Sequence, residues 1–332
     1  MTQSEQNDKI FTINETGFAA TAREMFRFQY ENNLLYKRFS DSLGIRTPEL
    51  HKVEQIPFLP IHFFKSHVIQ TTSFAPQAIF ESSGTTGTVN SRHGVKDLQW
   101  YEQSFTRAFE LFYGSIKGYC ILGLLPSYIE RKNSSLVYMT QRLIRLSGHP
   151  DSGFYLNEFD KLLETLDRLE RAGQKTILIG VTFALLDFAE KINTNENTIQ
   201  LRHTLIMETG GMKGRREEMI RDEVHQILKS KFQVSSIHSE YGMTELLSQA
   251  YSKENGIFRC PPWMKILVRD DEDPAQISHQ GMGLLNIIDF ANIYSCSFIA
   301  TDDIGKVFED GSFEVLGRKD NSDLRGCSLL VV

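Results

Sequence analysis

The sequence lacks the cysteine and histidine patterns that indicate a disulfide framework or a zinc site. Its four cysteines are far apart, with no Cys-x-x-Cys pair and no histidine at metal-ligand spacing; they are Cys120, Cys260, Cys296 and Cys327. Closely spaced ligands or cysteine pairs are the usual signatures of both kinds of site. We therefore expect free thiols in a reducing, cytoplasmic environment.

Long apolar runs and clusters of basic residues are also absent. No apolar stretch approaches the length of a membrane-spanning helix, and the polar, acidic N-terminus is unlike a secretory signal peptide. The formal net charge is −6, with Lys and Arg spread along the chain. We therefore expect no membrane span and no nucleic-acid partner.

What is present is an ordinary globular composition. The 332 residues are 41% hydrophobic, which is enough for one large domain or two packed subdomains. Residues 1–55 are predicted to form a helical segment built on a helix over about 18–39, with Asn14 or Thr16 as its cap. The predicted buried face of this helix is Phe18, Ala22, Met25, Phe26, Tyr30 and Leu34.

Residues 56–282 alternate between apolar strands and amphipathic helices. Strands are predicted at 77–81, 119–125, 176–180, 203–207 and 233–238, and helices at 98–113, 134–146, 158–172, 183–192 and 213–231. This order is typical of an α/β architecture with largely parallel, buried strands. Residues 283–332 are predicted to form a β-rich subdomain, with strands at 283–290 and 295–301 and a hairpin over 305–316 that turns at Asp310-Gly311.

The loop Ser82-Ser83-Gly84-Thr85-Thr86-Gly87 follows the first of these strands. Glycines let a backbone approach a polyphosphate closely, and hydroxyl and N–H groups donate to phosphate oxygens. The loop lacks the Gly-Lys-Ser/Thr ending of a Walker loop, which argues against an ordinary P-loop NTPase. Taken alone, it is equally a solvent-exposed turn.

Later motifs place carboxylates where a nucleotide and its metal would need them. Tyr241-Gly242-Met243-Thr244-Glu245 sets a carboxylate beside a hydroxyl, and Mg²⁺ prefers such oxygen ligands. It is otherwise a tight turn that opens a helix. A third motif is Thr301-Asp302-Asp303-Ile304-Gly305. It either provides a carboxylate that binds ribose hydroxyls or forms only the turn that enters the hairpin. Gly317-Arg318-Lys319-Asp320 follows the hairpin.

In their order and spacing, these motifs and Thr209-Gly210-Gly211 resemble the adenylate-forming superfamily of acyl-CoA synthetases, peptide-synthetase adenylation domains and luciferases. The chain looks closer still to the LuxE-type acyl-protein synthetases, the fatty-acid-activating subunits of bacterial fatty acid reductases. The segments that carry this second resemblance are Leu124-Leu125-Pro126-Ser127-Tyr128, Ser134-Ser135-Leu136-Val137-Tyr138-Met139, Glu208-Thr209-Gly210-Gly211-Met212-Lys213-Gly214-Arg215 and Arg325-Gly326-Cys327. The likeness runs from about Phe58 to the C-terminus.

The resemblance implies ATP and Mg²⁺ as cofactors and a role for each matching residue. The ATP phosphates would lie against Ser83, Gly84, Thr85, Thr86 and Gly87. Gly210 and Gly211 would lie along the adenine, and Tyr241 and Gly242 would flank the base and the acyl carbonyl. Thr244 would lie near the α-phosphate and Glu245 would bind Mg²⁺. Asp303 would bind the ribose, and Arg318 would reach the ribose or a phosphate.

The sequence departs from the superfamily pattern twice. In the superfamily the phosphate loop usually continues to a lysine, whereas here it continues to Arg92. Either Arg92 provides the positive charge of that lysine or no residue does. The chain also ends soon after Asp320, the family's hinge position, so the superfamily's C-terminal lid and its catalytic lysine are expected to be absent. The candidates for a replacement cation are Lys213, Arg215, Lys319 and Arg325.

The resemblance further implies that a carboxylic acid, which in the LuxE-type family is a fatty acid, becomes acyl-AMP and then acylates an enzyme cysteine. Cys327 is the matching position, and Arg325 would lower its pKa, although residues 327–332 also read as a buried terminal strand. Two alternatives stay open. The acyl group goes to coenzyme A or a carrier protein, or the chain is a catalytically impaired subunit that binds a nucleotide or acyl group. An acyl-accepting partner would be a reductase, a carrier protein or CoA.

Overall fold

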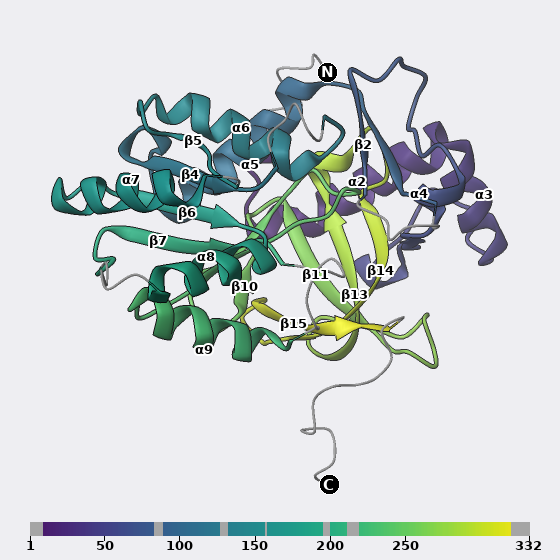
Figure 1. Ribbon diagram of the computed structural model, residues 1–332. Helices are drawn as coiled ribbons and strands as arrows, with labels where there is room; N and C mark the ends of the chain where they lie inside the picture. The colour runs from purple at the N-terminus through teal and green to yellow at the C-terminus, as the bar shows by residue number, and fades with distance from the viewer. Residues whose placement is uncertain are drawn as a thin grey trace, which may run out of the picture. The chain divides into compact units, whose positions relative to one another are not determined.

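The computed structural model describes residues 9–82, 89–126, 132–156, 158–194, 200–210 and 219–319. The chain divides into two compact units, each drawn from several segments. Unit 1 comprises Met1–Ala108, Met243–Gln249 and Arg259–Val332, and unit 2 comprises Phe109–Gly242 and Ala250–Phe258. Figure 1 labels their elements. No helix of the described ranges is long and apolar enough to cross a membrane.

Unit 2 is built on a parallel sheet of apolar strands. The strands β4 (Cys120–Leu124), β6 (Thr176–Gly180), β7 (Thr204–Glu208) and β8 (His238–Tyr241) are parallel in that order, and the short β5 (Gly153–Phe154) is parallel to β4. Every residue of β4 and β6 is buried, which explains their unbroken apolar sequences. After β8 the sheet continues with β9 (Ala250–Ser252), which is antiparallel to β8, and β10 (Ile257–Arg259).

Helices cover both faces of this sheet. The helices α7 (Phe159–Arg171), α8 (Thr182–Thr194) and α9 (Arg221–Phe232) share one hydrophobic cluster with alternate residues of β4 and with Leu178 of β6. On the other face, a Cβ on Gly123 would meet Thr140 of α6 (Ser135–Ser147). Figure 1 shows α8 and α9 below the strands and α6 above them. The carboxyl ends of the strands are therefore left for the loops.

Unit 1 contains an antiparallel sheet in the order β12-β11-β13-β14-β15, with β1 (Leu59–Pro60) parallel to β14. The bounds are β11 Met264–Arg269, β12 Ile277–Ser278, β13 Gly281–Asp289, β14 Phe298–Val307 and β15 Phe313–Arg318. A separate hairpin pairs β2 (Ala78–Glu81) with β3 (Arg92–Val95). The helices are α2 (Glu15–Asn32), α3 (Leu34–Ser42), α4 (Phe63–Ser66) and α5 (Leu98–Tyr113), the last of which ends in unit 2. Short 3₁₀ helices lie at Val53–Gln55 and Phe290–Asn292 in unit 1 and at Ile116–Gly118 in unit 2.

The predicted α/β class is confirmed, and so are most predicted strands and helices of unit 2, within a few residues. The predicted helix over 18–39 is wrong as a single element, because it breaks at Asn33. The Asn33 side chain accepts a hydrogen bond from the Tyr36 N–H and so starts α3. Leu34 begins the new helix and is 64% exposed, contrary to the predicted buried face. Asn14 caps α2 as predicted.

Two strand predictions are also corrected. The segment 233–238 is mostly loop, because Gln233 ends α9 in a left-handed conformation (φ 55°), and His238 begins β8 instead of ending a strand. Asp303 does not lie in a turn before the hairpin. It lies within β14, which runs without interruption from Phe298 to Val307 and takes up a bulge opposite β15 between Ile304 and Gly305.

Candidate active site

Glu245 of unit 1 lies buried near two other residues predicted from separate motifs. Its exposed fraction is 6%. Burial raises the pKa of the Glu245 carboxyl, and the charge of Asp303 raises it further, whereas a hydrogen bond from Ser91 and the charge of Arg318 lower it in part. The residue follows Thr244 in a turn. The structure thus brings Glu245, Asp303 and Arg318 into one electrostatic neighbourhood.

Asp303 and Arg318 face each other across β14 and β15. Arg318 Nε donates to Asp303 Oδ1 at 2.8 Å. The Asp303 side chain is 5% exposed, whereas that of Arg318 is 61% exposed. Behind them, the buried Arg269 donates to the carbonyl of Thr301 and holds the start of the motif. A fixed carboxylate with an accessible guanidinium suits the recognition of hydroxyl groups and anions.

The peptide of Thr244 and Glu245 is held from behind by buried side chains. His93 Nδ1 lies 2.8 Å from the Thr244 carbonyl, and Asn292 Nδ2 donates to the Glu245 carbonyl at 2.6 Å. Burial lowers the pKa of His93 to about 4, so the ring is neutral at neutral pH. Sequence reasoning missed both residues. The available signal was the pair of polar residues at alternate positions, 91 and 93, directly after the phosphate loop.

In unit 2, Glu208 anchors the loop of Gly210 at the carboxyl end of β7. Glu208 Oε2 accepts from the Gly210 N–H at 2.6 Å and from Thr182 Oγ1 at 3.2 Å, and Oε1 accepts from Arg221 Nε at 3.2 Å. Burial alone would raise its pKa, but the interactions with His225 and Arg221 outweigh burial and lower it to about 2. Gly210 has φ +75°, which glycine adopts at little cost. Sequence reasoning included Gly210 but not its anchor.

The remaining predicted site residues divide into described and undescribed ones. Tyr241 ends β8, is buried and packs its ring 5.8 Å from that of Phe258, and Gly242 follows it at an exposed position. Their predicted contacts with the base and the acyl carbonyl stay predictions. Outside the described residues lie Ser83, Gly84, Thr85, Thr86, Gly87, Gly211, Cys327, Lys213, Arg215, Asp320 and Arg325.

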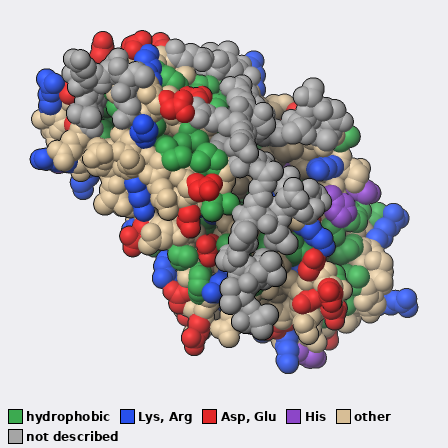
Figure 2. Space-filling model, turned by 60° about the horizontal axis from the view of Figure 1, so that its bottom comes forward, with side chains coloured by type: hydrophobic (Ala, Val, Ile, Leu, Met, Phe, Trp, Pro, Cys, Tyr) green, Lys and Arg blue, Asp and Glu red, His purple; other side chains and the backbone are tan. Residues whose placement is uncertain are grey.

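Two described residues are candidates for missing positive charges, Arg92 for the phosphate-loop lysine and Lys319 for the lid lysine, and both are ion-paired. Arg92 Nε lies 3.4 Å from Glu81 Oε1, with the arginine side chain 60% exposed. Lys319 pairs with Asp271, and both side chains are exposed. On the face seen in Figure 2, acidic and basic side chains are interspersed, with no single-sign patch among the described residues. Neither candidate is favoured by its geometry.

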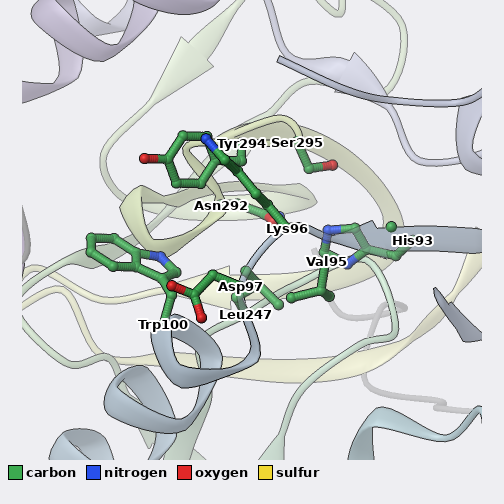
Figure 3. A pocket seen from close by; sticks show the side chains of 10 residues that line it. His93, Val95, Lys96, Asp97, Trp100, Leu247, Asn292, Tyr294 and Ser295 are labelled. Atoms are coloured by element: carbon green, nitrogen blue, oxygen red, sulfur yellow. The ribbon is translucent and has the colours of Figure 1, made fainter. Parts of the chain in front are cut away.

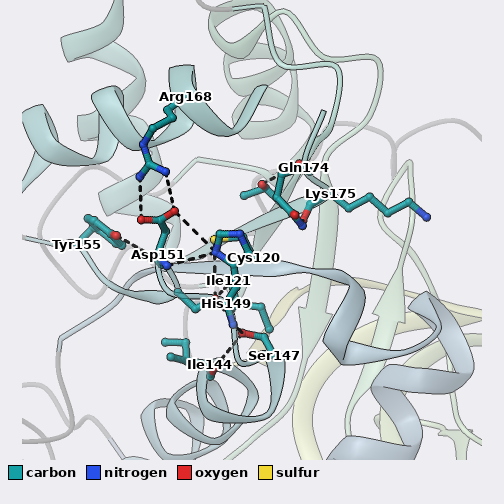
Figure 4. A network of polar contacts seen from close by, with 12 residues as sticks. Cys120, Ile121, Ile144, Ser147, His149, Asp151, Tyr155, Arg168, Gln174 and Lys175 are labelled. Atoms are coloured by element: carbon teal, nitrogen blue, oxygen red, sulfur yellow. Dashed lines mark hydrogen bonds and ion pairs between the residues drawn. The ribbon is translucent and has the colours of Figure 1, made fainter. Parts of the chain in front are cut away.

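Each cysteine of the described ranges has a thiol with a raised pKa. Cys120 begins β4 and lies in the polar network of Figure 4, where Ser152 Oγ donates to its sulfur at 3.8 Å. In the same network Arg168 forms a bidentate salt bridge with Asp151. Burial raises the pKa of Cys120 to about 11 and that of Cys296 to about 12, and it raises the pKa of Cys260 further. Thiolates are the reactive form of cysteine, so these three are poor nucleophiles.

Comparison with solved structures identifies the class of fold. The chain is similar to 2-hydroxyisobutyryl-CoA ligase in complex with 2-HIB-AMP and CoA, with a TM-score of 0.67, 13% identity, and coverage of 96% of this chain and 69% of that one. It is also similar to ATP-bound MatB from Rhodopseudomonas palustris, with a TM-score of 0.52 and 19% identity over 73% of this chain. The match spans only 48% of MatB. The fold is that of adenylate-forming enzymes.

Sequence comparison identifies the family. The model of the LuxE acyl-protein synthetase family matches residues 4–332. The chain therefore belongs to the LuxE family of acyl-protein synthetases. Two relatives are long-chain-fatty-acid–luciferin-component ligases: one from Aliivibrio fischeri is 24% identical over 92% of this chain and 85% of its own length, and one from Vibrio harveyi is 23% identical over 92% and 84%. The resemblance stated from the motifs is thus confirmed.

Proposed function

We propose that this acyl-protein synthetase uses MgATP to activate a long-chain fatty acid as acyl-AMP and passes the acyl group to a protein thiol. The observation that carries the proposal is the grouping of Glu245, Asp303 and Arg318 in unit 1. These residues come from three separate motifs, and Glu245 is far from the other two in the sequence. The names of the relatives, which act on long-chain fatty acids, support the choice of substrate.

The residues around Glu245 fit a magnesium ion that is shared with ATP. Among the described residues, no group of three or more His, Cys, Asp or Glu is arranged to hold a metal by itself. Mg²⁺ usually needs only one or two carboxylates when substrate phosphates supply further oxygens. Glu245 is a buried carboxylate with a raised pKa, which a nearby cation would stabilise in its charged form. Bound Mg²⁺ would neutralise charge on the ATP phosphates.

In the proposed first step, a carboxylate oxygen of the acid attacks the α-phosphorus of ATP. A new P–O bond forms, and the bond to the departing pyrophosphate breaks. The chain contributes alignment and charge neutralisation. Asp303 would accept hydrogen bonds from the ribose hydroxyls, and the exposed guanidinium of Arg318 would meet the ribose or a phosphate. Glu208 would hold the Gly210 loop in shape for the adenine.

In the proposed second step, the thiolate of Cys327 attacks the acyl carbonyl and AMP leaves. A thioester bond forms, the bond from the carbonyl carbon to the phosphate oxygen breaks, and the thiol proton passes to solvent. The support for Cys327 is its position near the C-terminus, which matches that of the acylated cysteine implied by the resemblance to the LuxE-type family. The other cysteines, Cys120, Cys260 and Cys296, have thiols whose raised pKa values make them poor nucleophiles.

ATP–pyrophosphate exchange tests the activation step. Acetate, an aromatic acid and a series of long-chain fatty acids are compared at saturating ATP and Mg²⁺. We expect exchange with long-chain acids and much less with acetate. Exchange with none of the acids would contradict the proposal and favour a subunit that only binds a nucleotide or an acyl group.

Labelling with radioactive fatty acid tests the acceptor. We expect the wild-type chain to retain label in the presence of ATP, and Cys327→Ser to lose it while still exchanging pyrophosphate. The matched control is Cys260→Ser, which should label like the wild type. Label that persists in Cys327→Ser would remove the role of this cysteine. Acylation of added CoA or carrier protein, without any labelled enzyme, would assign the thiol to that partner instead.

A further inference from the structure

His93 lies on the strand that follows the phosphate loop and has no part in the function proposed above. It stands opposite Phe80 in the β2–β3 hairpin and is 1% exposed. Its ring packs edge-on against Phe64, with the ring centroids 5.6 Å apart. Burial and the contact with Phe64 therefore restrict the orientation of the imidazole.

The contact with Thr244 determines which nitrogen of the ring carries the hydrogen. His93 Nδ1 lies 2.8 Å from the Thr244 carbonyl oxygen. A carbonyl oxygen only accepts hydrogen bonds, so Nδ1 is the donor and, in the neutral ring, Nε2 is an acceptor. Nε2 and the Oδ1 atom of Asn292 are both buried and have no partner at normal hydrogen-bond geometry within the described part of the chain, although an interaction between the two side chains opposes the lowering of the His93 pKa by burial. Both side chains line the small hollow shown in Figure 3.

The same segment is held at two further points. Asn292 Nδ2 donates to the Glu245 carbonyl at 2.6 Å. Ser91, which directly precedes β3 and lies two residues before His93, hydrogen-bonds the Glu245 carboxyl. The backbone stays extended just before β3, where the Ser82 N–H donates to the Ser91 carbonyl at 3.1 Å, so Ser91 and His93 point to one face and both reach this segment. Two consecutive carbonyls and one carboxyl are thus held by buried side chains.

We propose that His93 is a positioning residue that ties the strand after the phosphate loop to the Thr244–Glu245 peptide through its Nδ1–H donor. The inference rests on the proposed roles of Thr244 and Glu245 toward MgATP. With the donor in place, the peptide plane is fixed, and with it the directions in which the two side chains leave the backbone.

A pair of amide substitutions separates positioning from simple packing. In His93→Asn the amide nitrogen replaces Nδ1 at nearly the same distance from the backbone, whereas in His93→Gln it lies farther out, as Nε2 does. His93→Leu removes every donor. The control is His149→Gln, which changes a histidine of the Figure 4 network in unit 2. Circular dichroism and thermal unfolding are recorded for every protein, and His93→Gln carries the test if His93→Leu does not fold.

Two readouts are measured on each protein: pyrophosphate exchange with a long-chain acid at varied Mg²⁺, and MgATP binding by calorimetry. We expect His93→Gln and His93→Leu to lose about 10- to 100-fold in exchange kcat and to bind MgATP more weakly, as for the loss of one buried hydrogen bond. His93→Asn and His149→Gln should stay within about threefold of the wild type.

Equal behaviour of His93→Asn and His93→Gln would overturn the inference, because only the position of the donor differs between them. So would wild-type exchange and binding in His93→Leu. The proposed function fails separately, by an absence of exchange in the wild type with every acid. In that case the comparison of MgATP binding between the two amide variants still decides the role of His93.

Discussion

Replacing Glu208 by glutamine should destabilise unit 2 in a pH-dependent manner. The substitution keeps the shape of the side chain and removes its charge, so Arg221 loses a buried partner and the Gly210 N–H meets an amide. A pKa lowered from 4.5 to about 2 corresponds to about 3 kcal/mol of stability in the ionised form. The loss expected for Glu208→Gln at pH 7 is therefore about 3 kcal/mol.

The sign of the pH dependence follows from the direction of the pKa change. The folded-state pKa of Glu208 lies below the unfolded one, so the stabilisation is fully present above about pH 5.5 and is lost as the pH falls toward 2. The difference between wild type and variant should shrink from about 3 kcal/mol at pH 7 to about 2 kcal/mol at pH 3.5.

Urea unfolding followed by far-ultraviolet circular dichroism measures this difference. Tryptophan fluorescence is unsuitable, because Trp100 and Trp263 both lie in unit 1. The control is Glu158→Gln, which removes an exposed pair with Lys161 and should change stability by less than about 0.5 kcal/mol. A loss below about 1 kcal/mol for Glu208→Gln at pH 7, or a loss that does not vary with pH, would refute the reasoning.

Three further predictions follow from single contacts. Gly305→Ala should destabilise unit 1 by about 2 kcal/mol or more in urea unfolding, because its Cβ would meet a backbone oxygen and lie 2.9 Å from the Leu285 methyls. The control Gly118→Ala, whose Cβ would meet nothing within 4 Å, should be nearly neutral. Equal losses of stability in the two variants would contradict this account. Asp303→Ala should raise the KM for ATP about 10-fold or more without changing the circular dichroism spectrum, and an unchanged KM would remove its nucleotide role. Cys120 should resist a thiol reagent in the native protein and react after unfolding, since it is buried with a raised pKa; fast native labelling would exclude its burial.

The strands β4, β6 and β7 were predictable because each is a short, largely apolar run between predicted helices. The strand β8 (His238–Tyr241) is polar in sequence and was predicted one segment too early. The break between α2 and α3 was not predictable, because the residues on both sides of Asn33 continue the helical pattern. The break is marked by the Asn33 side chain, which accepts from the Tyr36 N–H and so caps α3. The uninterrupted β14 was hidden for a similar reason. Its polar residues Asp302 and Asp303 suggest a turn, but both lie within the continuous strand, where Asp303 is paired with Arg318 of β15.

The motif residues of the site were predictable in kind, whereas the residues that hold them were not. Pairing of β14 with β15 places Arg318 opposite Asp303, but Glu245 lies in a turn about 60 to 70 residues earlier in the sequence and reaches them only through the tertiary fold. His93 and Asn292 act through backbone atoms of distant segments, and Glu208 acts through the nearby Gly210 N–H and through side chains of other elements. The sequence shows polar residues at these positions but not the groups that they contact. Burial of these polar residues became apparent only with the fold.

Oxygen-18 transfer tests the central claim, that a carboxylate oxygen attacks the α-phosphorus of ATP. The chain is incubated with MgATP, a long-chain fatty acid labelled with ¹⁸O in its carboxyl group and an acyl acceptor, and the AMP is analysed by mass spectrometry. Formation and transfer of acyl-AMP predict AMP that carries one ¹⁸O atom. Unlabelled AMP, or release of ADP in place of AMP, would contradict the account.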